Sequence, residues 1–207
     1  MTRISIELLG LKDKLLDVSY PLFTYFGRQI EINVVAAFCL AISFGLLGVL
    51  IKTRRRDYLV ISMALFLLFS ILIAGLGVEP RGLNLYINTR GAFLYACLTA
   101  ASVLLLERYL WDSRRYIIPL TTYGLAVWVT LVSDLVRMPE LFKILPKNLN
   151  PVIGVAGFLD GVFICGLGAL ISSSTIIVCH LQLRKLVDAS LRGLSKQRQE
   201  TSRISTS

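Results

Sequence analysis

Residue types that carry catalytic chemistry are scarce in this sequence. Its 207 residues include one histidine, His180, and four cysteines, none of which forms a C-x-x-C pair. A single histidine excludes zinc motifs such as H-E-x-x-H. A glycine-rich phosphate loop and the G-x-S-x-G elbow of serine hydrolases are also missing. The sequence therefore predicts no cofactor and no metal site, and an enzyme is the less favoured class.

The four cysteines also argue against a disulfide scaffold. Cys39, Cys97, Cys165 and Cys179 all fall inside apolar runs. Disulfide-rich domains place their cysteines in exposed loops of small secreted chains. We therefore interpret these cysteines as small packing residues.

What the sequence does contain is long apolar runs. A helix rises about 1.5 Å per residue, so about 20 apolar residues cover a hydrocarbon core of about 30 Å. Five runs reach this length, at 33–51, 58–78, 91–111, 116–136 and 157–179. The predicted fold class is an all-α membrane protein, a bundle of about five transmembrane helices spanning residues 31–180.

Both flanks of this predicted bundle have amphipathic patterns. In residues 1–30, apolar residues recur from Ile4 to Leu22 at three- and four-residue steps, which predicts a helix in the headgroup layer, broken near Pro21. Such a helix caps the bundle or docks a partner, and it does not resemble a signal peptide. Residues 181–207 form a basic tail expected to bind anionic lipid, with a polar distal part from Gln199 expected to be disordered.

The distribution of charge indicates an orientation. The net charge is +9, and the basic residues gather beside the apolar runs, which favours a membrane over nucleic acid as the partner. Thirteen of the 22 basic residues fall in 52–57, in 107–115 and in the tail from 180. The positive-inside rule then places the N-terminus outside and the C-terminus in the cytoplasm. The expected location is the plasma membrane of the cell.

Ionisable residues at membrane depth are candidates for a polar site. A carboxylate at the bilayer centre costs about 2.5–3.5 kcal/mol, so such a residue usually has a partner or a function. Asp134, Asp160, Arg90 and Arg81 all fall toward the outer side in the predicted topology. The structural alternative is that Asp134 pairs with Arg137 on one helix face and that Asp160 caps the last helix. A capping Asp160 would leave residues 152–159 as a re-entrant turn instead of the start of that helix.

The fifth run has the clearest packing signal. Small residues recur at four-residue steps, at Gly157, Gly161, Cys165, Ala169 and Ser173. A ridge of this kind lets another helix approach closely, because little side chain separates the backbones. We therefore expect helix–helix packing along this face, within the chain or in an oligomer.

Three functions remain open at this point. The favoured one is a non-catalytic accessory subunit, assembly factor or sensor module that acts through helix contacts with a membrane-protein partner or a second copy. The alternative is a small oligomeric transporter or channel with a polar path near Asp160 and Ser172–Thr175. The third is an intramembrane enzyme that uses Asp134 and Asp160 as a carboxylate pair. Neither the ligand nor the partner can be named from the sequence.

Overall fold

The computed structural model describes residues 19–52, 56–81, 84–110, 117–146, 149–153 and 161–204. Side chains are described except those of 47–56, 108–110 and 192–204. Residues 1–18 of the expected interfacial helix, and with them most of its pattern, lie outside the described residues. Gly157 and Asp160 also lie outside them.

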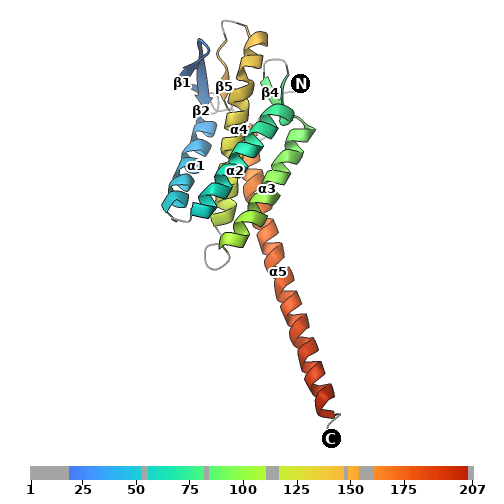
Figure 1. Cartoon of the computed structure of the whole chain (residues 1–207). Helices are drawn as coiled ribbons and strands as arrows, with labels where there is room; N and C mark the ends of the chain where they lie inside the picture. Colours follow the sequence, from blue (N-terminus) through green and yellow to red (C-terminus); the bar gives the residue numbers. More distant parts are fainter. Residues whose placement is uncertain are drawn as a thin grey trace, which may run out of the picture.

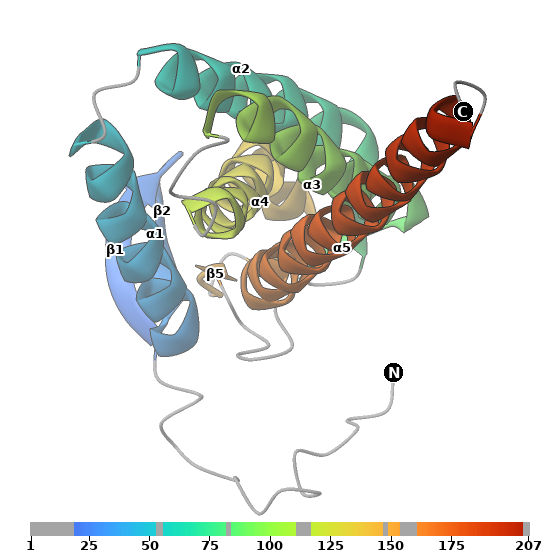
Figure 2. The same ribbon diagram turned by 90° about the horizontal axis from the view of Figure 1, so that it is seen from below.

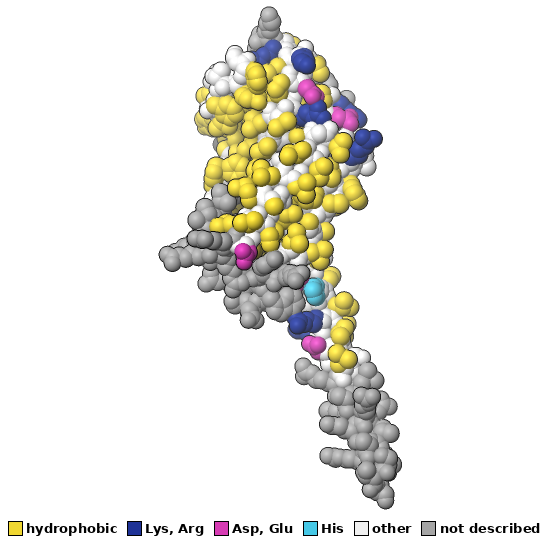
Figure 3. Space-filling view, in the orientation of Figure 1, with side chains coloured by type: hydrophobic (Ala, Val, Ile, Leu, Met, Phe, Trp, Pro, Cys, Tyr) yellow, Lys and Arg dark blue, Asp and Glu magenta, His cyan; other side chains and the backbone are white. Residues whose placement is uncertain are grey.

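The apolar runs form helices, and these helices make up most of the molecule (Figure 1). The helices are α1 (Val34–Lys52), α2 (Arg56–Leu72), α3 (Thr89–Leu110), α4 (Ile117–Ile144) and α5 (Gly161–Ile204), and a π-helical turn, η2 (Ile73–Gly77), continues α2. Four stretches are long and apolar enough to cross a membrane: Asp57–Gly77, Thr89–Glu107, Ile117–Ile144 and Gly161–Leu191. In α1 the described apolar part is shorter, Val34–Leu46. Hydrophobic side chains dominate the helical surface in Figure 3.

Helix α4 lies at the centre of the bundle. It packs against α1, α2, α3 and α5, and Figure 2 shows it enclosed by the other helices. Ala126, Val127 and Val129 are completely buried although they point in different directions around the helix. A helix that is apolar all round belongs in the interior, and α4 supplies most of the surface on which the other helices pack.

One end of the bundle carries a small sheet that the sequence did not predict, and we call this end the strand end. Strands β1 (Ser19–Tyr25) and β2 (Arg28–Asn33) form an antiparallel hairpin, and β5 (Val152–Ile153) pairs with β2 in parallel. Residues 19–22, the last part of the helical pattern that was expected to break near Pro21, are therefore strand and not helix. Phe26 and Gly27, with φ of 48° and 76°, make the tight turn between the strands.

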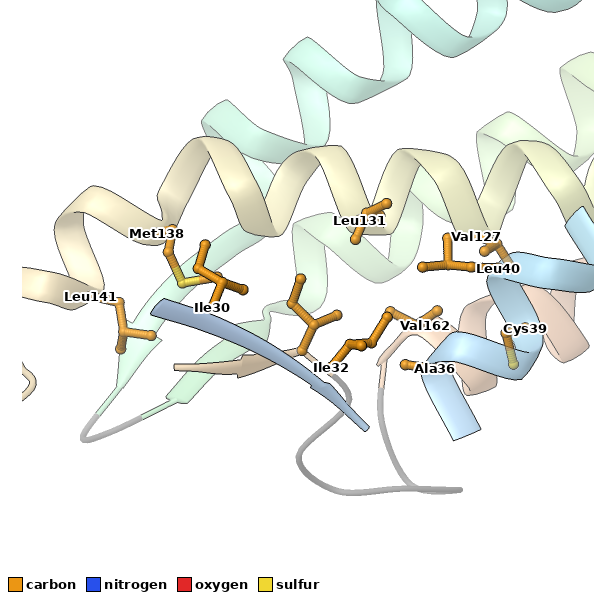
Figure 4. Close-up of a cluster of buried hydrophobic side chains, with 11 residues drawn as sticks. Ile30, Ile32, Ala36, Cys39, Leu40, Val127, Leu131, Met138, Leu141 and Val162 are labelled. Atoms are coloured by element: carbon orange, nitrogen blue, oxygen red, sulfur yellow. The ribbon is translucent and has the colours of Figure 1, made fainter. Parts of the chain in front are cut away.

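The hydrophobic pattern of β2 explains why this hairpin is stable. Ile30 and Ile32 alternate along the strand and are 0% and 5% exposed. In Figure 4 both side chains lie between β2 and α4, against Met138 and Leu141 at one end and near Leu131 farther along. Alternation with a period of two buries one face of a strand, so residues after Tyr25 follow strand periodicity and not the helical periodicity that precedes them.

A second hairpin covers the strand end beside α3. It consists of β3 (Val78–Arg81) and β4 (Asn84–Ile87), which pair in antiparallel register. Gly77, directly before the hairpin, and Gly91, in the first turn of α3, bring two backbone segments together: a Cβ added to Gly91 would lie 2.4 Å from the carbonyl oxygen of Gly77. Only glycine fits at this contact, which fixes the hairpin against the first turn of α3.

Helices α4 and α5 are longer than the apolar runs that predicted them. Helix α4 continues eight residues past Val136, through Pro139, because Met138 and Leu141 remain buried under β2. Helix α5 begins at Gly161, so a single helix starting at Val152 is excluded by the β5 strand. It is helical to Ile204, and the disorder expected from Gln199 is therefore not found up to that residue.

Candidate functional site

A groove lies between α3, α4 and α5 below the β3–β4 hairpin. Its volume is about 700 Å³. Ala92 and Ala96 of α3 face Ile164 and Gly168 of α5 across it, and all four are exposed. Ala92, Ala96 and Gly168 have little or no side chain to fill the space between the two helices. In the membrane such an opening would face the lipid.

The floor of the groove is polar but internally satisfied. The hydroxyls of Tyr95 and Thr130 lie 2.6 Å apart and share a hydrogen bond. Thr130 also bonds to the carbonyl of Ala126 in its own helix, at 2.8 Å. Thr99 Oγ1 donates to the carbonyl of Tyr95 at 2.9 Å. The bond between Tyr95 and Thr130 joins α3 to α4 at the floor of the groove. The three bonds together offset the desolvation penalty of the buried hydroxyls.

Asp134 lines the groove at the end nearest the strands. Its carboxylate is half-buried, and Asn84 and Tyr86 of β4 line the same cavity. The side chain is a member of the polar site predicted from the sequence. A carboxylate in this position is suited to accept hydrogen bonds from a cationic or hydroxyl-bearing group.

The two arginines of the predicted site are organised around a different carboxylate, Glu79. Arg81 Nη2 lies 3.4 Å from Glu79 Oε2, and Asn88 Nδ2 donates to Glu79 Oε1 at 2.6 Å. The hydrogen bond from Asn88, together with the charges of Arg81 and Arg90, holds the pKa of Glu79 below its usual value. The network therefore stabilises the β3–β4 hairpin at the surface.

Arg137, expected to pair with Asp134, fastens α4 to the end of η2. It donates to the carbonyl oxygens of Ala74 and Gly75, the latter at 2.8 Å, and forms an ion pair with Glu140 three residues later. The C-terminal carbonyls of a helical turn carry partial negative charge, so a guanidinium group satisfies them well. Arg137 thus has a structural role at the strand end.

The packing of α5 on α4 uses part of the predicted small-residue ridge. Ala169 and Ser173 are buried, whereas Cys165 is half-buried and lines the groove. The tightest contact is at Gly166, which the prediction omitted. A Cβ there would lie 2.8 Å from Val127 Cγ2 and 2.9 Å from a ring carbon of Tyr123.

The spacing of the buried residues explains why the ridge prediction was shifted. Val162, Gly166, Ala169 and Ser173 follow a 4-3-4 spacing, which keeps to one side of a helix better than strict four-residue steps do. Gly161, the remaining described ridge residue, lies against Ile87 of β4, 3.1 Å from where its Cβ would be. A search for 4-3-4 spacing of small residues would have found the contact face.

The hydroxyls of Ser172–Thr175 are mostly turned back on α5. Ser173 donates to the carbonyl of Ala169, Ser174 to that of Leu170 and Thr175 to that of Ile171, at 2.6, 2.7 and 2.9 Å. Ser172 lines the groove.

A buried carboxylate that the sequence reading passed over joins α3 to α5. Glu107 is 5% exposed, and its Oε2 lies 3.1 Å from Nδ1 of His180. Its Oε1 has no hydrogen-bond partner among the described residues. The pair lies where α5 leaves the bundle, so it ties the start of the projecting helix to α3. An acidic residue near the end of a predicted crossing was the available signal.

Beyond His180, α5 leaves the bundle and extends far from it (Figure 1). Every described residue from Gln182 to Leu191 is exposed. Leu183, Leu186, Val187 and Leu191 are 63%, 68%, 49% and 59% exposed, and together they form what we call the α5 stripe.

The described residues hold no group of three or more metal-ligating His, Cys, Asp or Glu side chains. The groove brings the carboxylate of Asp134, the hydroxyls of Tyr95 and Thr130 and the thiol of Cys165 to the lining of one cavity. Comparisons of the chain with protein-family models, with curated proteins and with solved structures gave no match.

Proposed function

We propose that this protein is a non-catalytic membrane module, an accessory subunit or sensor that acts on a partner protein through α5. The observation that carries the proposal is the form of α5: its first half packs on α4, and the residues described from Gln182 to Leu191 in its second half are exposed and include the α5 stripe. From Leu181 to Ile204 this half extends about 36 Å. An exposed apolar stripe on such a helix favours association with another protein.

The membrane setting of the proposal follows from the apolar helices. We propose five crossings, with α1 the first, and the strand end outside the cell membrane. Helix α1 ends at Lys52 and α2 begins at Arg56 at the opposite end of the bundle, which we call the basic end. In this orientation the basic end is cytoplasmic. In this arrangement the second half of α5 lies in the cytoplasm.

The charge of the projecting helix indicates the chemistry of the partner. Residues 181–204 contain six basic and two acidic residues. Two parallel copies of this helix would place like charges side by side, which is unfavourable. We therefore propose an acidic protein surface, with an apolar groove that accepts the α5 stripe, as the partner in preference to a second copy.

The groove supports the sensor form of the proposal. Helix α5 forms one wall of the cavity that contains Asp134, and the same helix continues to the exposed α5 stripe. A ligand in the groove would therefore touch the element that contacts the partner. A translocation path is less well supported, because Ser173, Ser174 and Thr175 already bond to their own helix.

The test is purification of the full chain from its own membranes in mild detergent, with mass spectrometry of co-migrating proteins. We expect a stoichiometric acidic partner. Leu183→Ser combined with Leu186→Ser should weaken the complex about a hundredfold or more, because each buried leucine contributes about 1.5–3 kcal/mol. The control, Gln182→Ser with Ala189→Ser, alters the same helix outside the α5 stripe and should retain the partner.

Two results would contradict the proposal. One is a chain that migrates alone, as a monomer or homo-oligomer. The other is a complex that survives the double leucine substitution as well as it survives the control. Asp134→Asn should leave the complex intact, because the groove lies on the bundle and away from the α5 stripe.

A further inference from the structure

A second groove lies on the other side of α4, between α1, α2 and α4. Its volume is about 470 Å³, and its walls are almost entirely apolar. Leu59 and Met63 of α2 face Leu120 of α4 across it, and Gly124 forms part of its base. This groove shares no lining residue with the groove that contains Asp134.

The groove has about the length of one lipid leaflet. The rings of Phe44 and Trp128 pack edge to face at 4.5 Å and belong to the end farthest from the basic end. From Trp128 to Leu120 the groove follows α4 for eight residues, or about 12 Å. Half of a bilayer's hydrocarbon core is about 15 Å thick, so a single acyl chain running down from the basic end matches this length.

Two polar groups that line the groove lack a hydrogen-bond partner among the described residues: the hydroxyl of Ser62 and the indole Nε1 of Trp128. Ser62 is 7% exposed. The neighbouring hydroxyls of Ser43 and Thr121 are satisfied by Leu40 O and Ile117 O, at 2.8 Å each. A buried donor left unpaired costs free energy, so an acceptor brought by an occupant would stabilise this site.

The charge beside the groove indicates the headgroup. Leu59 is three residues after Arg56, and Lys52 ends the adjacent helix, so two cationic residues stand at the basic end of α1 and α2. Cationic residues at a membrane surface attract anionic lipid headgroups. These features match the parts of one anionic phospholipid. The apolar groove matches an acyl chain, the unpaired hydroxyl of Ser62 matches an ester carbonyl, and the cationic residues match the anionic headgroup.

We propose that the α1–α2–α4 groove binds one acyl chain of an anionic phospholipid. The headgroup lies at the basic end near Lys52 and Arg56, and the hydroxyl of Ser62 donates to an ester carbonyl oxygen of the lipid. The terminal methyl group reaches toward Trp128. The proposal concerns a lipid that belongs to the folded protein and does not depend on the partner of α5.

The experiment uses Trp128 as the reporter. The chain contains two tryptophans, and Trp111→Phe leaves Trp128 as the only one. This full-length variant is reconstituted into phosphatidylcholine vesicles with increasing fractions of a lipid whose acyl chains carry bromine, which quenches tryptophan fluorescence on contact. The brominated lipid is phosphatidylglycerol in one series and phosphatidylcholine with identical chains in the other.

Quenching by phosphatidylglycerol should reach its midpoint at a mole fraction about fivefold lower, or more, than quenching by phosphatidylcholine, given the contribution of each cation near an anionic lipid. Equal midpoints in the two series would refute the proposal, because the quenching would then come only from the lipids that surround any membrane protein and not from a bound anionic lipid. Lys52→Gln with Arg56→Gln should bring the two midpoints together, and an unchanged difference would likewise overturn it.

A groove-filling variant tests the position of the chain. A Cβ at Gly124 meets only Ser43 Cβ, at 4.0 Å, so Gly124→Leu projects into the groove without a backbone clash. It should abolish the preference for phosphatidylglycerol. Gly45→Leu is the matched control, because Gly45 has no neighbour within 4 Å and does not line the groove. Retention of the preference in Gly124→Leu would place the lipid elsewhere.

Discussion

The contact between α4 and α5 provides the sharpest test of the structure. Gly166 and Gly168 are two residues apart on α5, yet they meet different surroundings. A Cβ on Gly166 would lie 2.8 Å from Val127 Cγ2 and 2.9 Å from the ring of Tyr123, whereas a Cβ on Gly168 finds nothing within 4 Å. Replacing each glycine by alanine therefore isolates the effect of the contact.

The size of the effect follows from two terms. Alanine is favoured over glycine in a helix by about 0.8–1.0 kcal/mol, and this term is the same for both positions. Overpacking a filled interface costs about 1–3 kcal/mol. Val127 is completely buried and stiff at χ1, so it cannot move aside easily. Gly166→Ala should thus be about 1–3 kcal/mol less stable than Gly168→Ala, because the helix-propensity term cancels in the difference.

The measurement is reversible unfolding of both variants in mixed micelles, followed by far-ultraviolet circular dichroism as the denaturing detergent is increased. Gly168→Ala should unfold at or above the wild-type midpoint and Gly166→Ala below it. If the two variants unfold at the same midpoint, α5 does not pack on α4 through Gly166, and the arrangement of the bundle is refuted.

Two further predictions concern the strand end. Gly91→Ala should destabilise the protein more than Gly166→Ala does, because its Cβ would lie 2.4 Å from the backbone oxygen of Gly77, and backbone atoms cannot rotate away. The control is Gly75→Ala, which should not destabilise the protein in this way, because a Cβ there has no neighbour within 4 Å. Equal losses of thermal stability in Gly91→Ala and Gly75→Ala would contradict the contact. Hydrogen bonds from Ser19 and Asn150 lower the pKa of Glu31, so its stabilising effect is present above the unfolded-state value and is lost as the pH falls through the lowered folded-state pKa. Unfolding free energies of wild type and Glu31→Gln should differ at neutral pH and converge at acid pH; a constant difference would be evidence against this linkage.

Helix formation in this protein follows from local sequence, because each apolar helix satisfies its own backbone hydrogen bonds and needs only a long apolar stretch. The ends of the helices do not follow in the same way. Helix α4 continues past the apolar run because Arg137 bonds to carbonyls of η2 and because Met138 packs beneath β2. Both partners lie more than 60 residues away in the sequence, so no local pattern identifies them.

The candidate sites show the same division. Asp134 was predicted as a residue of interest from its depth in an apolar run, and it lines the first groove, but the sequence did not indicate that the charges of Arg81 and Arg90 act on Glu79. Glu107 was passed over, because a single acid near a helix end is unremarkable until His180 lies beside it. Grooves are properties of three helices together, and no single run predicts them.

The sequence by itself determined the composition of the fold: apolar helices of membrane-crossing length, with basic residues gathered at their ends. Tertiary structure alone decided the pairing of β2 with β5 across more than a hundred residues, the close contact at Gly166 and the course of α5 out of the bundle. The physical reason is the range of the interactions. Backbone hydrogen bonding and burial in lipid act within one segment, whereas strand pairing, glycine contacts and grooves depend on which segments meet.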